Sequence, residues 1–353
     1  MLVRGLSIAL LSWRSSAAEG QLRFLYLTVD EAGRSQIHLA ALSDEGTLVH
    51  SRALTDASVA VWDFAPTRDG DKVIYSALGE MGMSDLWQVS LVSNQIQSFL
   101  PCPEAACSNG RLGPDGRLFA YTRRNLTTFT SAFFSPPRLW LLDTATGQSA
   151  AIFADSQRLS MEARWSADGQ WLSFVSPEPQ GLGVYNLNDG REALYTSALG
   201  EASEWSPLAP HFLTTTSWQQ GETYVTHLLR GDAESSELLD VSGEEALVED
   251  SSGSFSPDGG WIAFRRKLLT GPQATRGKQI WVMDAAGGSA RQLTNDSDAD
   301  FGTPAWSPDG RYLLTRRFSL QGPAIVPTIW LIDVASGESR LLIEPGDQPV
   351  WVP

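Results

Sequence analysis

The chain has 353 residues, of which 42% are hydrophobic, and a formal net charge of −15. A chain of this length buries about three quarters of the surface that its unfolded form exposes, so it needs no metal or disulfide framework to fold. Its negative field repels phosphate groups, so we do not expect nucleic acid as a partner. The same field suits cations or basic peptides, or it only keeps the protein soluble.

Residues 1–20 are predicted to be a signal peptide or a disordered N-terminus. Arg4 precedes a short apolar run from Leu6 to Trp13, and small residues follow at Ser15 to Ala18. This pattern resembles a secretory signal and is too short to span a bilayer. We therefore expect an extracytoplasmic protein, periplasmic, secreted or envelope-associated, without a transmembrane span.

Cys102 and Cys107 are the two cysteines of the chain. A close pair in an exported protein predicts one local disulfide that pins a loop. A redox pair or half of a metal site is the alternative, but supporting ligands are missing from the neighbouring sequence.

A short motif recurs along the chain at intervals of about 50 residues. It consists of an aromatic or apolar anchor, Ser-Pro-Asp-Gly or a variant, and then an apolar run. The clear copies are Leu112–Tyr121, Trp165–Phe174, Phe255–Phe264 and Trp306–Leu314. The glycine supplies the positive φ of a tight hairpin, and short strands repeated at this period are typical of a β-propeller.

The anchors of the first strands predict the number of blades. They fall at Trp62, Leu112, Trp165, Trp205, Phe255, Trp306 and Trp351. We therefore predict an all-β fold, with residues 21–353 forming a single seven-bladed β-propeller. The Trp205 copy is the poorest because it lacks the Asp-Gly turn.

The two ends of the chain are complementary fragments of one blade. The N-terminus supplies strands at 24–27, 36–39 and 51–54, and the C-terminus supplies a lone first strand at 349–352. We expect these strands to pair, since the pairing closes the ring and removes exposed strand edges.

The repeat resembles that of the TolB-type, WD40-like propeller family. The resemblance rests on the Trp-Ser-Pro-Asp-Gly core, on Leu293–Asp296 before it and on the segment Asp300–Pro304, and it covers roughly residues 22–353. Relatives of this kind include TolB of an envelope-stabilising complex, propeller domains of prolyl-oligopeptidase-like enzymes, and oligogalacturonate lyases. The chain differs from TolB itself, which has a smaller N-terminal α/β domain and six repeats. The resemblance therefore implies the fold rather than a function.

Long irregular loops are expected on one face of the propeller, at 122–138, 267–278 and 318–328. We call this side the irregular-loop face, and we expect any site there because variable loops on a rigid scaffold carry binding sites. Acidic residues precede several anchors, and arginine pairs end three second strands. The candidate binding residues are Asp56, Glu249, Asp250, Asp300, Asp347, Arg124, Arg266 and Arg317.

Two interpretations of these charges stay open. The carboxylates could line a channel mouth that binds a hard cation or a basic peptide. Alternatively, the arginines neutralise them in ion pairs, and at most one arginine of each adjacent pair can reach a given carboxylate. Asp347 and Asp56 lack an arginine pair in their own blades, so they are the candidates for a weakly bound calcium ion. We expect no other cofactor.

Catalytic signals are weak in the sequence. No Gly-x-Ser-x-Gly nucleophile motif occurs, and none of His38, His50, His211 and His227 lies on a first strand. The favoured expectation is therefore a monomeric, non-enzymatic scaffold that binds a protein or peptide partner through the irregular-loop face. The alternative is a lyase- or hydrolase-type enzyme with an acidic and arginine-containing site at the channel mouth.

Overall fold

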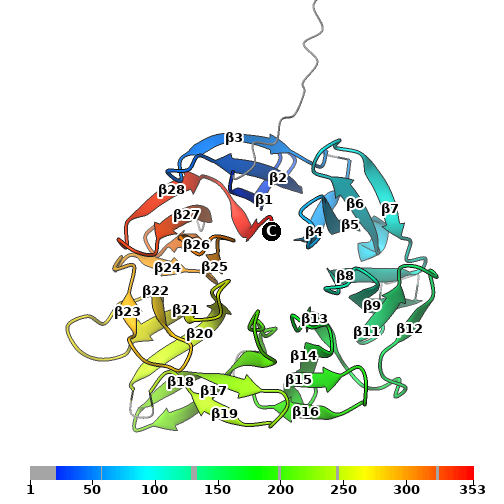
Figure 1. Ribbon diagram of the computed structural model, residues 1–353. Coiled ribbons are helices and arrows are strands. Elements are labelled where there is room, and N and C mark those ends of the chain that lie inside the picture. The colour runs from blue at the N-terminus through cyan, green and yellow to red at the C-terminus, as the bar shows by residue number, and fades with distance from the viewer. Residues whose placement is uncertain (1–20, 57, 129–132, 198–199, 244–245, 323–325) are drawn as a thin grey trace, which may run out of the picture.

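The computed structural model describes residues 21–56, 58–128, 133–197, 200–243, 246–322 and 326–353. The predicted signal peptide lies outside these residues. β-Sheets are arranged around a common centre, with β4, β8 and β13 on the inner side and β3, β7, β12, β16, β19 and β28 at the rim (Figure 1). Their strands pair antiparallel, apart from parallel bridges between β6 and β8 and between β18 and β20. None of the helices described is long and apolar enough to cross a membrane.

The N-terminal half of the ring contains three antiparallel groups. The first is β4 (Ala60–Pro66), β5 (Lys72–Leu78), β6 (Ser84–Ser90) and β7 (Ile96–Leu100), with the short 3-10 turn η1 (Glu80–Gly82) after β5. The second is β8 (Ala105–Leu112), β9 (Leu118–Thr128), β11 (Arg138–Asp143) and β12 (Ser149–Ala151), with β10 (Phe133–Phe134) beside β9. The third is β13 (Met161–Trp165), β14 (Trp171–Pro177), β15 (Gln180–Asn186) and β16 (Glu192–Tyr195).

The C-terminal half continues the same pattern. β17 (His211–Gln220), β18 (Thr223–Asp232) and β19 (Leu238–Asp240) follow, with Trp205 bridged to Phe212. Then come β20 (Val248–Phe255), β21 (Trp261–Leu268), β22 (Gln279–Asp284) and β23 (Arg291–Gln292). The next group has β24 (Ala299–Phe301) and β25 (Ala305–Trp306), both paired with β26 (Tyr312–Ser319), and then β27 (Thr328–Asp333) and β28 (Ser339–Ile343).

The two ends of the chain share one sheet, in the order β29 (Asp347–Trp351), β1 (Arg23–Val29), β2 (Ser35–Leu42) and β3 (Leu48–Ala53). Phe24 lies opposite Trp351 and Leu25 opposite Val350, in antiparallel register. The predicted pairing of the C-terminal strand with the first N-terminal strand is therefore present.

The repeated hairpin explains why the motif needs serine, aspartate and glycine. The Ser307 hydroxyl donates to Asp309 Oδ1 at 2.6 Å and accepts the Tyr312 N–H at 2.9 Å. The same Oδ1 accepts the Arg311 N–H at 3.1 Å, while Gly310 has a φ of 72°. The two side chains thus satisfy the polar groups of a tight turn that joins the first and second strands.

The equivalent carboxylate of Asp258 gives a test of this turn. Its bonds from the Ser256 hydroxyl and the Gly260 N–H lower its pKa below the usual 3.8. The ionised form is therefore favoured in the folded state, so its stabilisation is complete above pH 3.8 and is lost as the pH falls through the lower folded value. We expect Asp258→Asn to lower the melting temperature at pH 7 and to have less effect at pH 3. A difference in melting temperature between Asp258→Asn and the wild type that is the same at both pH values would contradict this role.

The tryptophan anchors join neighbouring groups of strands. Trp306 Nε1 donates to the Ser254 carbonyl at 3.0 Å, and Trp351 Nε1 donates to the Ala305 carbonyl at 2.9 Å. Each accepting carbonyl belongs to the residue just before the anchor of the preceding group. An indole supplies both apolar contact and one N–H donor, which explains the preference for tryptophan at this position.

Replacement of Trp306 by phenylalanine should remove this bond and leave the Ser254 carbonyl without its donor. We expect the free energy of unfolding to fall by about 1–3 kcal/mol in urea denaturation. Trp261→Phe is the matched control, because Trp261 is 40% exposed on the surface. Equal losses of unfolding free energy in Trp306→Phe and Trp261→Phe would show that the Trp306 indole hydrogen bond does not contribute to stability.

The structure corrects one anchor, Trp62. The Thr67 N–H bonds to the Lys72 carbonyl, as the Ser307 N–H does to the Tyr312 carbonyl, so the anchor position before Thr67 is occupied by Pro66. Trp62 lies four residues earlier on β4 and is 60% exposed. The prediction of Trp62 as an anchor was wrong because this copy of the motif has proline in place of the aromatic residue.

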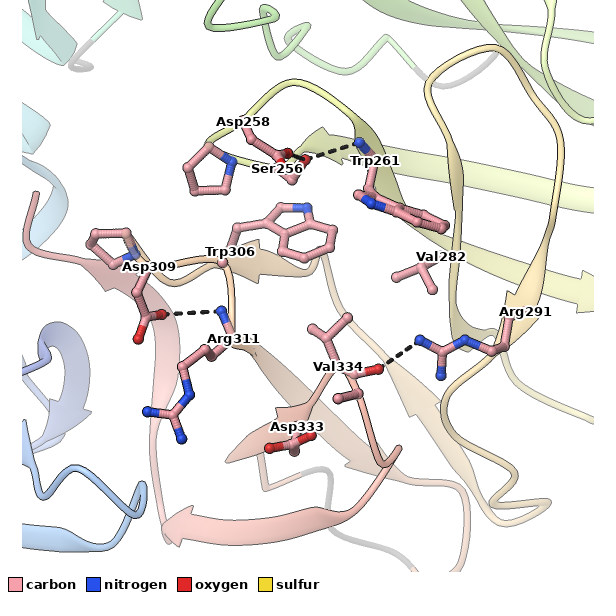
Figure 2. A pocket seen from close by; sticks show the side chains of 14 residues that line it. Ser256, Asp258, Trp261, Val282, Arg291, Trp306, Asp309, Arg311, Asp333 and Val334 are labelled. Atoms are coloured by element: carbon pink, nitrogen blue, oxygen red, sulfur yellow. Dashed lines mark hydrogen bonds between the residues drawn. The ribbon is translucent and has the colours of Figure 1, made fainter.

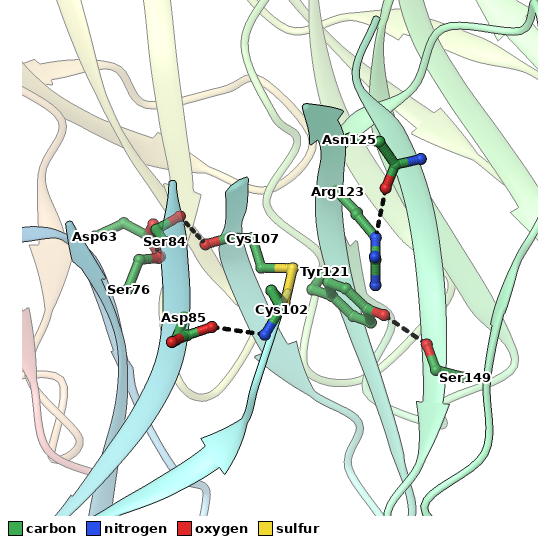
Figure 3. Close-up of a disulfide and its surroundings, with 10 residues drawn as sticks. All are labelled: Asp63, Ser76, Ser84, Asp85, Cys102, Cys107, Tyr121, Arg123, Asn125 and Ser149. Carbon is green, nitrogen blue, oxygen red and sulfur yellow. Dashed lines mark hydrogen bonds between the residues drawn. A yellow bond between two sulfur atoms is a disulfide. The ribbon is translucent and has the colours of Figure 1, made fainter. Parts of the chain in front are cut away.

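Cys102 and Cys107 form the predicted disulfide, just before and within β8 (Figure 3). Asp85 accepts the Cys102 N–H at 2.6 Å, and the Ser84 hydroxyl donates to the Cys107 carbonyl at 2.7 Å. Both cysteines are buried. The bond therefore fixes the connection between β7 and β8 and leaves no exposed thiol.

Candidate functional site

The inner strands share a bulge that shapes the centre of the molecule. Strand pairing skips two residues in β4, β8, β13, β20 and β29. The skipped residues are Trp62–Asp63, Asn109–Gly110, Glu162–Ala163, Ser252–Gly253 and Gln348–Pro349. Asn109, Glu162, Ser252 and Gln348 have φ values of 53°, 57°, 50° and 48°. Residues other than glycine rarely adopt this conformation, and bulges of this kind redirect side chains next to functional sites.

A cavity of about 760 Å³ lies between these bulges on the irregular-loop side. Side chains from β4, β8, β13, β29 and the β1–β2 hairpin line it, together with Val326 and Pro327 before β27. A second cavity of about 740 Å³ adjoins it and shares Arg164, Gln348 and Val350. We call these two cavities together the central channel.

One wall of the channel is charged. Arg111 and Arg164 lie one residue before the anchors Leu112 and Trp165, on adjacent strand groups. The Arg164 guanidinium lies 3.6 Å from a carboxylate oxygen of Glu204. Sequence reasoning missed both arginines because it examined the loops and not the residue preceding each anchor. An alignment of the repeats would have shown that both arginines occupy the same position of the motif.

The Arg164 guanidinium affects the titration of Arg111. Desolvation, then repulsion from Arg164, lowers the pKa of Arg111 to about 10, while Asp63, Glu204 and Glu162 act in the opposite direction. Arg111 is therefore still a cation at neutral pH. The charged wall thus combines two close arginines with carboxylates from the neighbouring strands.

The channel also has an apolar lining. Val61, Val326, Pro327 and Val350 line the larger cavity beside the exposed ring of Trp62. An amphipathic channel of this size can hold a ligand with both charged and apolar groups.

Asp250 and Arg266, two predicted site residues, form a buried ion pair. Arg266 donates from Nε and Nη2 to the two carboxylate oxygens at 2.8 and 2.6 Å, and the Ser242 hydroxyl donates to Asp250 at 2.5 Å. Asp250 is fully buried and Arg266 is 7% exposed. This pair therefore faces the protein interior.

The other predicted charges pair across neighbouring strands. Asp300 contacts Arg265 at 2.9 Å and Asp347 contacts Arg316 at 3.0 Å, whereas Arg317 contacts Asp296 at 2.6 Å. In the pairs Arg265-Arg266 and Arg316-Arg317, the two side chains reach different carboxylates, as strand alternation requires. Asp347 thus finds its partner on the neighbouring group rather than its own.

The remaining predicted residues lie apart from these pairs. Glu249 contacts Lys267 at 3.7 Å, and Asp56 is exposed and accepts the Ser58 N–H. Arg124 bonds to the Ser135 carbonyl. Within the described ranges, no group of three or more His, Cys, Asp or Glu residues could hold a metal ion. Weak calcium binding at Asp347 and Asp56 stays a prediction, which calorimetric titration with calcium tests.

A further cavity of about 700 Å³ lies on the opposite, short-turn face between β20–β21 and β25–β28 (Figure 2). Its aspartates are occupied by their own turns, since Asp258 accepts the Gly260 N–H and Asp309 the Arg311 N–H. Arg291 donates to the Val334 carbonyl at 2.6 Å. The polar groups of this cavity thus serve the fold, and the central channel is the better candidate site.

Solved structures with a similar fold include a peptidase and TolB. No protein-family model matches the chain. A puromycin-hydrolyzing peptidase of Mycobacterium tuberculosis has a TM-score of 0.64 at 14% identity, covering 92% of this chain and 54% of that one. TolB from Acinetobacter baumannii has a TM-score of 0.54 at 15% identity, covering 94% and 67%. The all-β, propeller-like fold is therefore shown, while the TolB resemblance holds only in part.

Two curated relatives are named as peptidases. The uncharacterized peptidase YuxL of Bacillus subtilis is 29% identical over 206 residues, which are 57% of this chain and 28% of the relative. Dipeptidyl-peptidase 5 of Porphyromonas endodontalis is 22% identical over 273 residues, covering 62% and 38%. The match thus spans well under half the length of either relative.

These relatives correct the functional expectation. A non-enzymatic scaffold was expected because no catalytic constellation is visible in the sequence. Both named relatives are peptidases instead, which favours the hydrolase alternative. The error has a physical reason: the propeller repeat reports the fold alone, and the same fold carries different functions.

Proposed function

We propose that this protein is a peptidase-type hydrolase whose central channel binds the peptide substrate. The observation that carries the proposal is the channel itself, which is lined by Arg111, Arg164 and carboxylates as well as by apolar residues. Peptides present charged termini and apolar side chains, so this mixed lining matches their chemistry. The names of the two curated relatives support the class of reaction.

We assign the channel residues to substrate binding rather than to catalysis. His227 bonds to Asp240 and to the Ala246 carbonyl, so both of its ring nitrogens are occupied and it is unsuited to act as a general base. Trp62, in contrast, offers an exposed aromatic face at the channel mouth. We infer that it contacts an apolar side chain of the substrate.

We also propose that the fold is a seven-bladed propeller. The strand groups, begun in turn by β4, β8, β13, Trp205, β20, β24–β25 and β29, would make seven blades around the channel. Support comes from the repeated bulge and from the indole bonds between neighbouring groups. Deletion of one complete group should then abolish folding rather than yield a smaller ring.

An extracytoplasmic location is also proposed, and the Cys102–Cys107 disulfide supports it, because disulfides persist in oxidising compartments. Protein isolated from its own cells and alkylated without reductant should carry no label on either cysteine in mass spectrometry. Two labelled thiols would place the protein in a reducing compartment.

Peptidase activity of the native protein tests the proposed function. A tag fused to the gene at its chromosomal locus allows purification from the cells that make the protein. We expect hydrolysis of unblocked hexapeptides, followed by mass spectrometry, to be enriched with the tag, and Trp62→Ala to raise KM several-fold. Trp261→Ala, on the short-turn face, is the control and should leave KM unchanged. Activity no higher than in an untagged strain would refute the proposal.

A further inference from the structure

Arg111 and Arg164 occupy equivalent places on neighbouring strand groups. Each follows a bulge, and each donates from Nη1 to the carbonyl of the preceding residue, Gly110 at 2.8 Å and Ala163 at 3.1 Å. The indole of Trp165 donates to the Arg111 carbonyl at 2.9 Å and fixes the two strands together at this point. The fold therefore presents two guanidinium groups in matching orientation on the same cavity.

Most of their hydrogen-bonding capacity remains unused. A guanidinium has five N–H groups. Among the described residues, Arg111 makes one side-chain hydrogen bond and no ion pair, and Arg164 adds only the 3.6 Å approach to Glu204. Two close guanidinium groups without strong partners repel one another when the site is empty. An anion bound between them would relieve this repulsion and accept their hydrogen bonds.

The surroundings select the kind of anion. Asp63, Glu162 and Glu204 border the arginines, and the whole chain carries a charge of −15, so a multiply charged phosphate would be repelled. A single carboxylate fits two guanidinium groups and tolerates this field. The apolar side chains of Val61, Val350 and Trp62 line the same cavity.

We propose that Arg111 and Arg164 bind the free C-terminal carboxylate of a peptide whose last side chain is apolar and packs against the apolar residues of the same cavity near Trp62. This inference rests on the proposed peptidase function. It adds that the channel distinguishes a peptide with a free carboxyl end from one with a blocked end.

Binding of matched peptides tests the inference. A fluorescein-labelled hexapeptide ending in leucine is prepared as the free acid and as the C-terminal amide, and fluorescence anisotropy measures the Kd of the full chain for each. We expect the acid to bind at least about tenfold more tightly, as for a charge-assisted hydrogen bond. Arg111→Gln should remove most of this preference. Arg117→Gln is the control, since Arg117 pairs with Asp143 outside the channel.

The possible results distinguish failure of the carboxylate site from failure of the proposed function. Equal Kd values for acid and amide on the wild-type chain would overturn the carboxylate site and leave peptide binding intact. Binding of neither peptide would refute the proposed function together with this inference. Retention of the full preference in both Arg111→Gln and Arg164→Gln, each checked by its melting curve, would also overturn the assignment.

Discussion

Replacing Asp250 by alanine is expected to lower the free energy of unfolding by about 3–5 kcal/mol. Asp250 is fully buried and receives two bonds from Arg266 and one from the Ser242 hydroxyl. Without the carboxylate, the Arg266 guanidinium stays buried with only the Ser242 carbonyl as an acceptor at 3.1 Å. The cost arises from this uncompensated charge rather than from lost packing.

A double variant separates the two causes. Asp250→Leu combined with Arg266→Met removes both charges, so it should be more stable than Asp250→Ala alone. Urea denaturation of the wild type, of Asp250→Leu, of Arg266→Met and of the double variant gives the coupling energy. A single-variant loss below about 1 kcal/mol would place the pair in a solvated environment and contradict its burial.

Deletion of residues 347–353 should have a comparable or larger effect. β29 pairs with β1, and Trp351 and Val352 are 6% and 4% exposed. Their removal exposes the edge of β1 together with the apolar surface around Phe24, with an expected loss of about 5 kcal/mol or more. Deletion of the exposed Pro353 alone is the control. An unchanged melting temperature after the longer deletion would show that the pairing of the chain ends does not support the fold.

The repeated motif made much of the fold predictable. Ser, Asp and Gly have local roles in the hairpin, so copies such as Ser307–Gly310 report strand positions without knowledge of the rest of the chain. The pairing of the chain ends was predictable for a related reason, since the N-terminal strands form an incomplete copy of the repeat that requires a partner strand. Trp62 was misplaced because a tryptophan in the channel and a tryptophan anchor look alike in the sequence.

The channel residues were harder to predict. Arg111 and Arg164 reach the channel through bulges in which Asn109 and Glu162 adopt positive φ, and no residue type requires such a bulge. The loop charges were more visible, yet Asp250 faces the interior and Asp347 pairs with a neighbouring group. Pairing between groups depends on distances around the ring, which the sequence of one repeat does not contain.

Photo-crosslinking tests the central claim most directly. A peptide of the hexapeptide series with a photoactivatable apolar last residue is irradiated with the full chain, and the adducts are located by mass spectrometry. The channel account predicts adducts on β4 around Trp62 and at Val350, and competition by the unlabelled free acid. Adducts concentrated at Trp261 and Pro308, in the short-turn cavity, would contradict it.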